Sequence, residues 1–200
     1  MVNTSDDTPL GLDDDCPHTP EPRRRMALTF DAFHERHHGL WLRYARTQVG
    51  LRAGAEAVVD ATCSHLLHNW THALAQESVS AYAWSVLKER IRDWLDEHGR
   101  EPALAETASF DAVCRGRLLP ELRDEFEVLE SGMSLYSAIT RLPERQHDVI
   151  VLRYVLGCTD EEVAEHLGTV RATVRSQARQ AKRKLAARMN LHGGERAGER

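Results

Sequence analysis

The sequence lacks the features that mark several large classes of protein. It has no apolar run near the ~18 residues that a membrane-spanning helix needs, and its mean hydropathy is −0.49. The first 25 residues contain no apolar stretch of the kind that a secretory signal needs. We therefore expect a cytoplasmic protein that makes no membrane contact.

Cysteine is scarce and widely spaced. The four cysteines include no CxxC pair, which is the spacing that structural zinc sites use. Disulfides are rare in a reducing cytoplasm, so we expect free thiols. Eleven histidines are present, but their densest cluster, residues 34–38, lacks the HExxH pattern. The sequence thus predicts no metal site and no cofactor, and it favours solvated or partner-facing positions for these histidines.

Catalytic signatures are absent as well. The sequence contains no GxSxG motif and no glycine-rich phosphate-binding loop. Ser64 and His65 are adjacent, but no third residue nearby completes the arrangement of a catalytic triad. We expect no enzymatic activity of its own.

The pattern that is present is helical. No stretch shows the alternation of a β-strand, whereas apolar residues recur at three- and four-residue intervals. Segments 30–44, 59–74 and 79–95 contain all four tryptophans and predict a compact helical bundle over 26–97. A second helical block occupies 134–191. The sequence therefore predicts an all-α protein with two small helical domains.

The remaining segments differ in charge and composition. Residues 1–25 are rich in acid and proline and hold almost no large apolar side chain, so we expect a disordered acidic tail. Residues 98–133 carry excess acid with scattered proline and glycine and predict an acidic linker, in which a short helix over 118–129 can form. Residues 192–200 predict a flexible tail.

Residues 159–189 carry the most specific pattern. Thr159 and Glu162 have the spacing of a capping box that starts a short helix. Gly168 permits the left-handed turn that follows, and a longer basic helix comes next. The inward-facing positions hold Val163, Ala164, Leu167, Val174, Ala178, Ala181 and Leu185. This pattern is typical of a helix-turn-helix.

Charge indicates which face of the second helix meets a ligand. Seven basic residues and no acid lie between Gly168 and Leu191, although the whole chain carries a net charge of −5. A helix of this kind fits the major groove of DNA, where arginine pairs with guanine edges and hydroxyls contact bases or phosphates. The alternative is a solvated basic helix that serves an acidic partner. The candidate DNA-binding residues, which we call the basic set, are Arg171, Thr173, Arg175, Ser176, Arg179, Lys182 and Arg183.

Several short motifs in this domain follow a known family pattern. They are Leu142-Pro143, Glu162-Val163-Ala164, Leu167-Gly168 and Thr173-Val174-Arg175-Ser176. On these residues the domain resembles the C-terminal promoter-reading domain of bacterial RNA polymerase sigma factors of the extracytoplasmic-function (ECF) subfamily. It departs from that pattern at Gln180, where the family usually carries arginine. The resemblance implies a sigma factor that directs RNA polymerase core to specific promoters and reads the upstream promoter element with the helix-turn-helix. RNA polymerase core and promoter DNA are the implied partners, and the resemblance also admits an anti-sigma factor.

The N-terminal bundle resembles the other domain of the same family over 55–62 and 82–95. The resemblance implies that Glu56, Val59 and Asp60 bind the polymerase. It also implies that the bundle captures a single strand of the downstream promoter element. The aromatic and basic side chains suited to stacking on and neutralising that strand are Trp84, Lys88, Arg90 and Arg92. The apolar residues of segment 82–95 are equally compatible with burial in the core of the bundle.

Two other functions would use the same DNA-binding domain. A stand-alone helix-turn-helix transcriptional regulator would sense a signal or dimerise through its N-terminal bundle and would not bind core polymerase. Ala57 and Asp60, which depart from the family pattern of the polymerase-binding helix, keep that alternative open. A sigma-like protein that binds a partner but no longer melts DNA is the third possibility.

Overall fold

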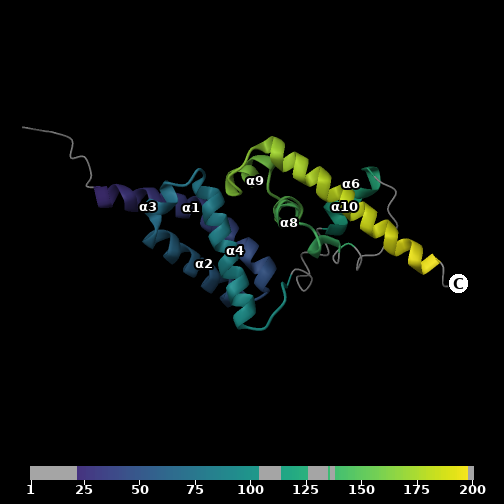
Figure 1. Cartoon of the computed structure of the whole chain (residues 1–200), viewed down its shortest axis with the longest axis horizontal. Helices are drawn as coiled ribbons and strands as arrows, with labels where there is room; N and C mark the ends of the chain where they lie inside the picture. Colours follow the sequence, from purple (N-terminus) through teal and green to yellow (C-terminus); the bar gives the residue numbers. More distant parts are fainter. Residues whose placement is uncertain (1–21, 104–113, 126–134, 136–137, 198–200) are drawn as a thin grey trace, which may run out of the picture.

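The structure is a computed structural model of the chain that describes residues 22–103, 114–125, 135 and 138–197. Every regular element within these ranges is helical, which confirms the all-α fold class. Figure 1 shows two groups of helices: α1 to α4 form one, and α6 to α10 form the other. We call them the N-terminal unit (residues 22–103) and the C-terminal unit (residues 114–197).

The N-terminal unit is a bundle whose apolar faces meet as their spacing predicts. Its helices are α1 (Pro22–Val49), α2 (Arg52–His68), α3 (Trp70–Leu74) and α4 (Val79–Glu97). Fully buried side chains include Trp41, Val49, Leu66 and Leu87. Helix α1 includes the last four residues of the segment predicted as a tail and begins at Pro22, a residue that suits the first turn of a helix. The rest of that tail lies outside the described residues.

Part of the predicted linker is helical. A π-helical turn, η1 (Cys114–Leu118), leads into α6 (Leu119–Glu125), within the region where the sequence allowed a short helix. The Leu118 and Leu122 side chains are fully buried. Glu121 accepts hydrogen bonds from the Tyr154 hydroxyl at 2.6 Å and from Lys182 Nζ at 3.3 Å. This segment therefore packs against η2 and α10 and belongs to the C-terminal unit.

The C-terminal unit contains the predicted helix-turn-helix. Its main elements are α8 (Glu144–Ile150), a π-helical turn η2 (Val151–Val155), α9 (Asp160–His166) and α10 (Arg171–Ala197). Gly157 and Gly168 have φ angles of 71° and 59°, the left-handed conformation that lets the chain turn before and after α9. Helix α10 continues into the segment predicted as a flexible tail, because a helix propagates readily once it has formed.

The two units dock on each other through α1 and α4 on one side and α8 and α9 on the other (Figure 1). Asp148 of α8 is 1% exposed and accepts three hydrogen bonds from the N-terminal unit. The donors are the Tyr44 hydroxyl at 2.6 Å, Trp84 Nε1 at 3.0 Å and Lys88 Nζ at 3.0 Å. A buried charge is tolerated only when it is paired and hydrogen-bonded, and this one meets both conditions.

The environment of Asp148 keeps its carboxylate ionised. Burial alone would raise its pKa. The contacts with His147, Lys88, Tyr44 and Trp84 outweigh burial and hold the pKa below the ordinary value of 3.8. The docked arrangement thus depends on a negative charge at this position.

A second contact joins α1 to α9. The Nδ1 atoms of His37 and His166 lie 2.7 Å apart, so one ring donates to the other. Burial, together with the charge of His166, lowers the pKa of His37 to about 4. Arg36 forms a bidentate pair with Glu165 at 2.7 and 2.6 Å. His37 is buried between the two units, whereas the sequence favoured solvated or partner-facing histidines in this cluster.

Gly168 allows α9 to approach α4 closely. A Cβ atom at this position would lie 2.7 Å from the Ala81 backbone nitrogen and would clash with Ser78 Oγ. Only glycine therefore fits both the left-handed turn and this contact between the units.

Candidate nucleic-acid interface

Local hydrogen bonds fix the start of α9. The Thr159 hydroxyl accepts from the Glu162 backbone N–H at 3.2 Å, and Glu162 Oε2 accepts from the Thr159 backbone N–H at 2.7 Å. Both bonds of the predicted capping box are thus present. The bonds from the backbone and side chain of Thr159 lower the pKa of Glu162.

Buried small side chains orient α10. Val174, Ala178, Ala181 and Leu185 are at most 1% exposed and face the interior of the C-terminal unit, as their spacing predicts. Helix side chains three and four positions apart share a face, so the opposite face of α10 is turned outward. Most of the basic set lies there.

Six of the seven residues of the basic set lie on the surface. The exposed ones are Arg171, Thr173, Arg175, Ser176, Arg179 and Arg183. Lys182 differs, because it is 7% exposed and donates to Glu121 of α6. The exposed residues present guanidinium groups and hydroxyls along one helix, which is the chemistry that reads base edges and phosphates in a major groove.

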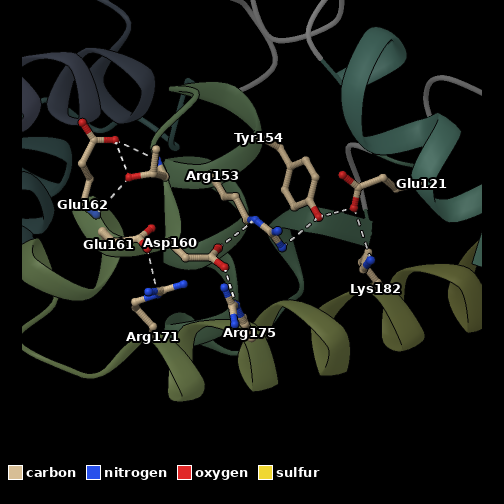
Figure 2. Close-up of polar contacts among 10 residues, drawn as sticks. Glu121, Arg153, Tyr154, Asp160, Glu161, Glu162, Arg171, Arg175 and Lys182 are labelled. Carbon is tan, nitrogen blue, oxygen red and sulfur yellow. Dashed lines mark hydrogen bonds and ion pairs between the residues drawn. The ribbon is translucent and has the colours of Figure 1, made fainter.

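Carboxylates of α9 hold two arginines of this face (Figure 2). Arg175 Nε donates to Asp160 Oδ2 at 2.8 Å, and Arg171 Nε lies 2.9 Å from Glu161 Oε1. The hydrogen bond and charge of Asp160 raise the pKa of Arg175, which stays cationic. The spacing of these acids predicts that they lie on the preceding helix, but nothing in the sequence indicates that they contact arginines of α10.

The candidates for single-strand capture are partly engaged by α8. Trp84 is 4% exposed and donates to Asp148, and Lys88 Nζ lies between Asp148 at 3.0 Å and Glu144 at 2.8 Å. Arg90 pairs with Asp93 of its own helix at 2.9 Å. Arg92 is exposed beside a cavity of about 250 Å³ between α4 and α8. The docked arrangement therefore does not present these four side chains as one open surface.

The candidates for polymerase binding differ in exposure. Glu56 accepts from Arg52 Nε at 2.7 Å, and Asp60 is exposed. Val59 is fully buried in the core of the N-terminal unit. Of these three candidates, Glu56 and Asp60 present side chains on the outer face of α2, while Val59 supports the helix from within.

In the described part of the chain, no group of three or more His, Cys, Asp or Glu side chains is placed to hold a metal ion. Cys63 and Cys158 are free thiols. Within the same residues, no helix combines the length and apolar character needed to cross a membrane.

Comparison with known proteins finds a family match within the C-terminal unit. Residues 132–185 match the family described as "Sigma-70, region 4", which confirms the resemblance to sigma factors over this segment. Among solved structures, one described as "1.8 A structure of RsbN-BldN complex." shares 18% identity, with 82% of this chain and 94% of that chain covered and a TM-score of 0.30. A likeness at that level adds no argument to the family match. No curated protein sequence matches the chain.

Proposed function

We propose that this chain, whose residues 132–185 match the sigma-70 region 4 family, is a sigma factor that brings RNA polymerase core to promoter DNA. The observation that carries the proposal is the exposed side of α10, where six residues of the basic set face outward on a helix-turn-helix of that family. Arginines and hydroxyls on such a helix suit base edges and phosphates.

The proposal assigns a separate role to each unit. The C-terminal unit reads the upstream promoter element through α10, and the N-terminal unit contacts the polymerase through the outer face of α2. Exposed Arg92, together with Trp84 and Lys88 once α8 has moved away, supports capture of a single strand from the downstream element by α4. Two contacts on one polymerase raise the effective concentration of each.

Co-purification with core polymerase tests the proposal against its main alternative. A sigma factor is expected to elute with the core enzyme in size-exclusion chromatography, and a stand-alone transcriptional regulator is expected to elute separately. The double variant E56A/D60A serves as the matched control, because both side chains lie on α2 and Asp60 is exposed. The proposal predicts that this variant binds DNA normally but elutes apart from the core enzyme.

A further comparison separates a decoy from an active factor. Transcription from a pre-melted template and from a fully duplex template is measured with the same complex. A protein that no longer melts DNA would be active on the first template alone, and the proposed function predicts activity on both.

A further inference from the structure

We propose that Asp160 is a positioning residue for DNA recognition, which holds Arg175 through Nε and leaves its two Nη groups for a base edge. The inference rests on the proposed function, because it requires α10 to face DNA. It goes further by naming a carboxylate that lies outside the basic set as a determinant of sequence specificity.

The geometry of the Arg175 side chain supports this role. The Asp160 Oδ2 atom accepts from Nε at 2.8 Å, and the Arg175 side chain is 59% exposed. A guanidinium carries five N–H donors in a planar fork, so fixing Nε also fixes the plane in which the Nη donors lie. An arginine in a fixed plane pairs with the O6 and N7 atoms of guanine at a smaller loss of side-chain entropy.

Asp160 itself is held from the opposite side. Its side chain is only 11% exposed, and Arg153 Nε lies 3.2 Å from Oδ1. This second contact is within ion-pair distance but lacks hydrogen-bond geometry, so its contribution is electrostatic. Arg153 in turn donates to the Tyr154 hydroxyl at 3.3 Å, which donates to Glu121 at 2.6 Å (Figure 2). The carboxylate is thus anchored to η2 and α6 and does not move freely with Arg175.

The neighbouring pair provides a comparison within the same helix. Glu161 contacts Arg171 Nε at 2.9 Å, but the two side chains are 57% and 53% exposed. Exposed ion pairs contribute little, because water and salt screen them and two long side chains must be ordered. Asp160 is therefore expected to affect recognition more strongly than Glu161.

The negative charge of Asp160 is expected to affect non-specific affinity and base discrimination in opposite directions. A carboxylate beside a DNA-facing arginine repels phosphate, so removing its charge favours binding to DNA of any sequence. The same removal frees Arg175 to adopt other conformations and weakens its preference for one base. Loss of Asp160 should therefore lower discrimination without lowering non-specific affinity, and a simple loss of folding would lower both.

The experiment uses the full chain and a DNA duplex selected from a random library by the wild-type protein. Dissociation constants are measured for the selected duplex, for each single base-pair change and for random DNA. The variants are D160N, E161Q, R175A and D160N/R175A. We expect D160N to reduce discrimination at one base pair by about threefold to tenfold, a part of what a bidentate contact supplies. E161Q should change discrimination by less than about twofold.

The double variant D160N/R175A and a substitution at Arg153 show whether Asp160 acts through Arg175. D160N should have no effect at that base pair when Arg175 is already alanine, because it acts through the arginine. R153Q, which removes the positive charge behind Asp160, should weaken discrimination at the same base pair and covers the case in which D160N does not fold. Equal losses by D160N on the selected and random DNA, or an unchanged effect in the R175A background, would overturn the inference.

The outcomes also separate this inference from the proposed function. If the wild-type chain selects no duplex, both fail. If it selects a duplex and D160N and R153Q leave every base preference intact, only the role of Asp160 fails.

Discussion

At the scale of the residue, short-range partners decide which charged groups of α10 face outward. Lys182 and Arg175 belong to the same basic set, yet Lys182 is buried against Glu121 while Arg175 is 59% exposed. The difference arises because α6 covers one side of α10 and leaves the other side open. The sequence predicts the same role for both residues, and only the structure shows that one is buried and the other exposed.

Arg175→Ala is expected to weaken binding to a selected duplex by about 1–3 kcal/mol, the contribution of a base-edge contact. The reason is that Arg175 presents an exposed guanidinium on the outward face of α10. Fluorescence anisotropy with labelled duplexes measures the change. Lys184→Ala is the matched control, since Lys184 is an exposed basic residue of α10 outside the basic set. Equal losses on selected and random DNA would show that Arg175 contacts phosphate only.

At the scale of the element, the helix-turn-helix does not stand alone. Helix α6 lies against it, with Leu118 and Leu122 fully buried and Glu121 bonded to Tyr154 and Lys182. Each fully buried leucine contributes about 1.5–3 kcal/mol through the apolar surface that it removes from water. The segment before the helix-turn-helix is therefore part of the same folded unit.

This packing predicts how fragments of the chain behave. A fragment of residues 114–197 should unfold at a higher temperature than one of residues 134–197, because the shorter one exposes the surface that Leu118 and Leu122 cover. Circular dichroism during heating measures both midpoints. The double variant L118A/L122A of the longer fragment is the control and should melt like the shorter one. Equal midpoints for the two fragments would contradict the packing described.

Local patterns were sufficient to predict much of the candidate site. The capping box of Thr159 and Glu162, the left-handed turn at Gly168 and the buried face that includes Val174 each depend on residues within one or two helical turns. Those features followed from spacing alone. Promoter reading by the basic set remains a prediction.

Features that depend on distant residues could not be predicted in this way. The donors to Asp148 lie 104, 64 and 60 positions away along the chain. Nothing in the pattern around Asp148 marks it as the residue that joins the two units. The packing of α6 was not predicted either, because it also depends on residues far away in the sequence. The acid-rich composition of this segment predicted a linker, although Leu118 and Leu122 are buried.

At the scale of the whole molecule, the docked arrangement limits what α4 can bind. Trp84 and Lys88 both donate to Asp148, so a nucleic-acid strand reaches them only after α8 has moved away. The exposed face of α10 is not covered in this way. Duplex reading by α10 is therefore compatible with the docked arrangement, and strand capture by α4 requires that it open.

Asp148→Asn is expected to loosen the docked units. The amide keeps the size of the side chain but removes the charge, and its NH₂ group then meets donors that the carboxylate accepted. We expect docking to weaken by about 2–3 kcal/mol, the contribution of hydrogen bonds to a charged group. Energy transfer between fluorophores on the two units measures the separation. Glu144→Gln is the control, since Glu144 also contacts Lys88 but is 64% exposed. No increase in separation for Asp148→Asn would contradict the role of this carboxylate.

Acid is also expected to open the two units, through the histidine pair. Burial lowers the pKa of His37 to about 4 and that of His166 below the ordinary value of 6.5. Charged neighbours of the pair are Arg36, Arg43, Glu162 and Glu165, of which the arginines lower and the glutamates raise these pKa values. The open form therefore binds protons first. Docking is fully stable above about pH 6.5 and weakens as the pH falls toward 4.

The contribution of Asp148 is lost only at lower pH. Its pKa lies below 3.8 in the docked form, so its stabilising effect persists until the pH falls below that value. Energy transfer between the two units as a function of pH separates the effects. The variant H37Q/H166Q should show a flat signal between about pH 6.5 and 5, above the range in which Glu165 is protonated. An unchanged pH dependence in this variant would exclude the histidine pair as the cause.

The most direct test of the central claim is transcription from a defined template. Full-length chain is mixed with purified core polymerase and a duplex that carries the selected sequence, and the RNA starts are mapped. We expect initiation at one position downstream of that sequence, dependent on the chain and reduced in the Arg175→Ala variant. Binding to DNA without any discrete, chain-dependent start would contradict it.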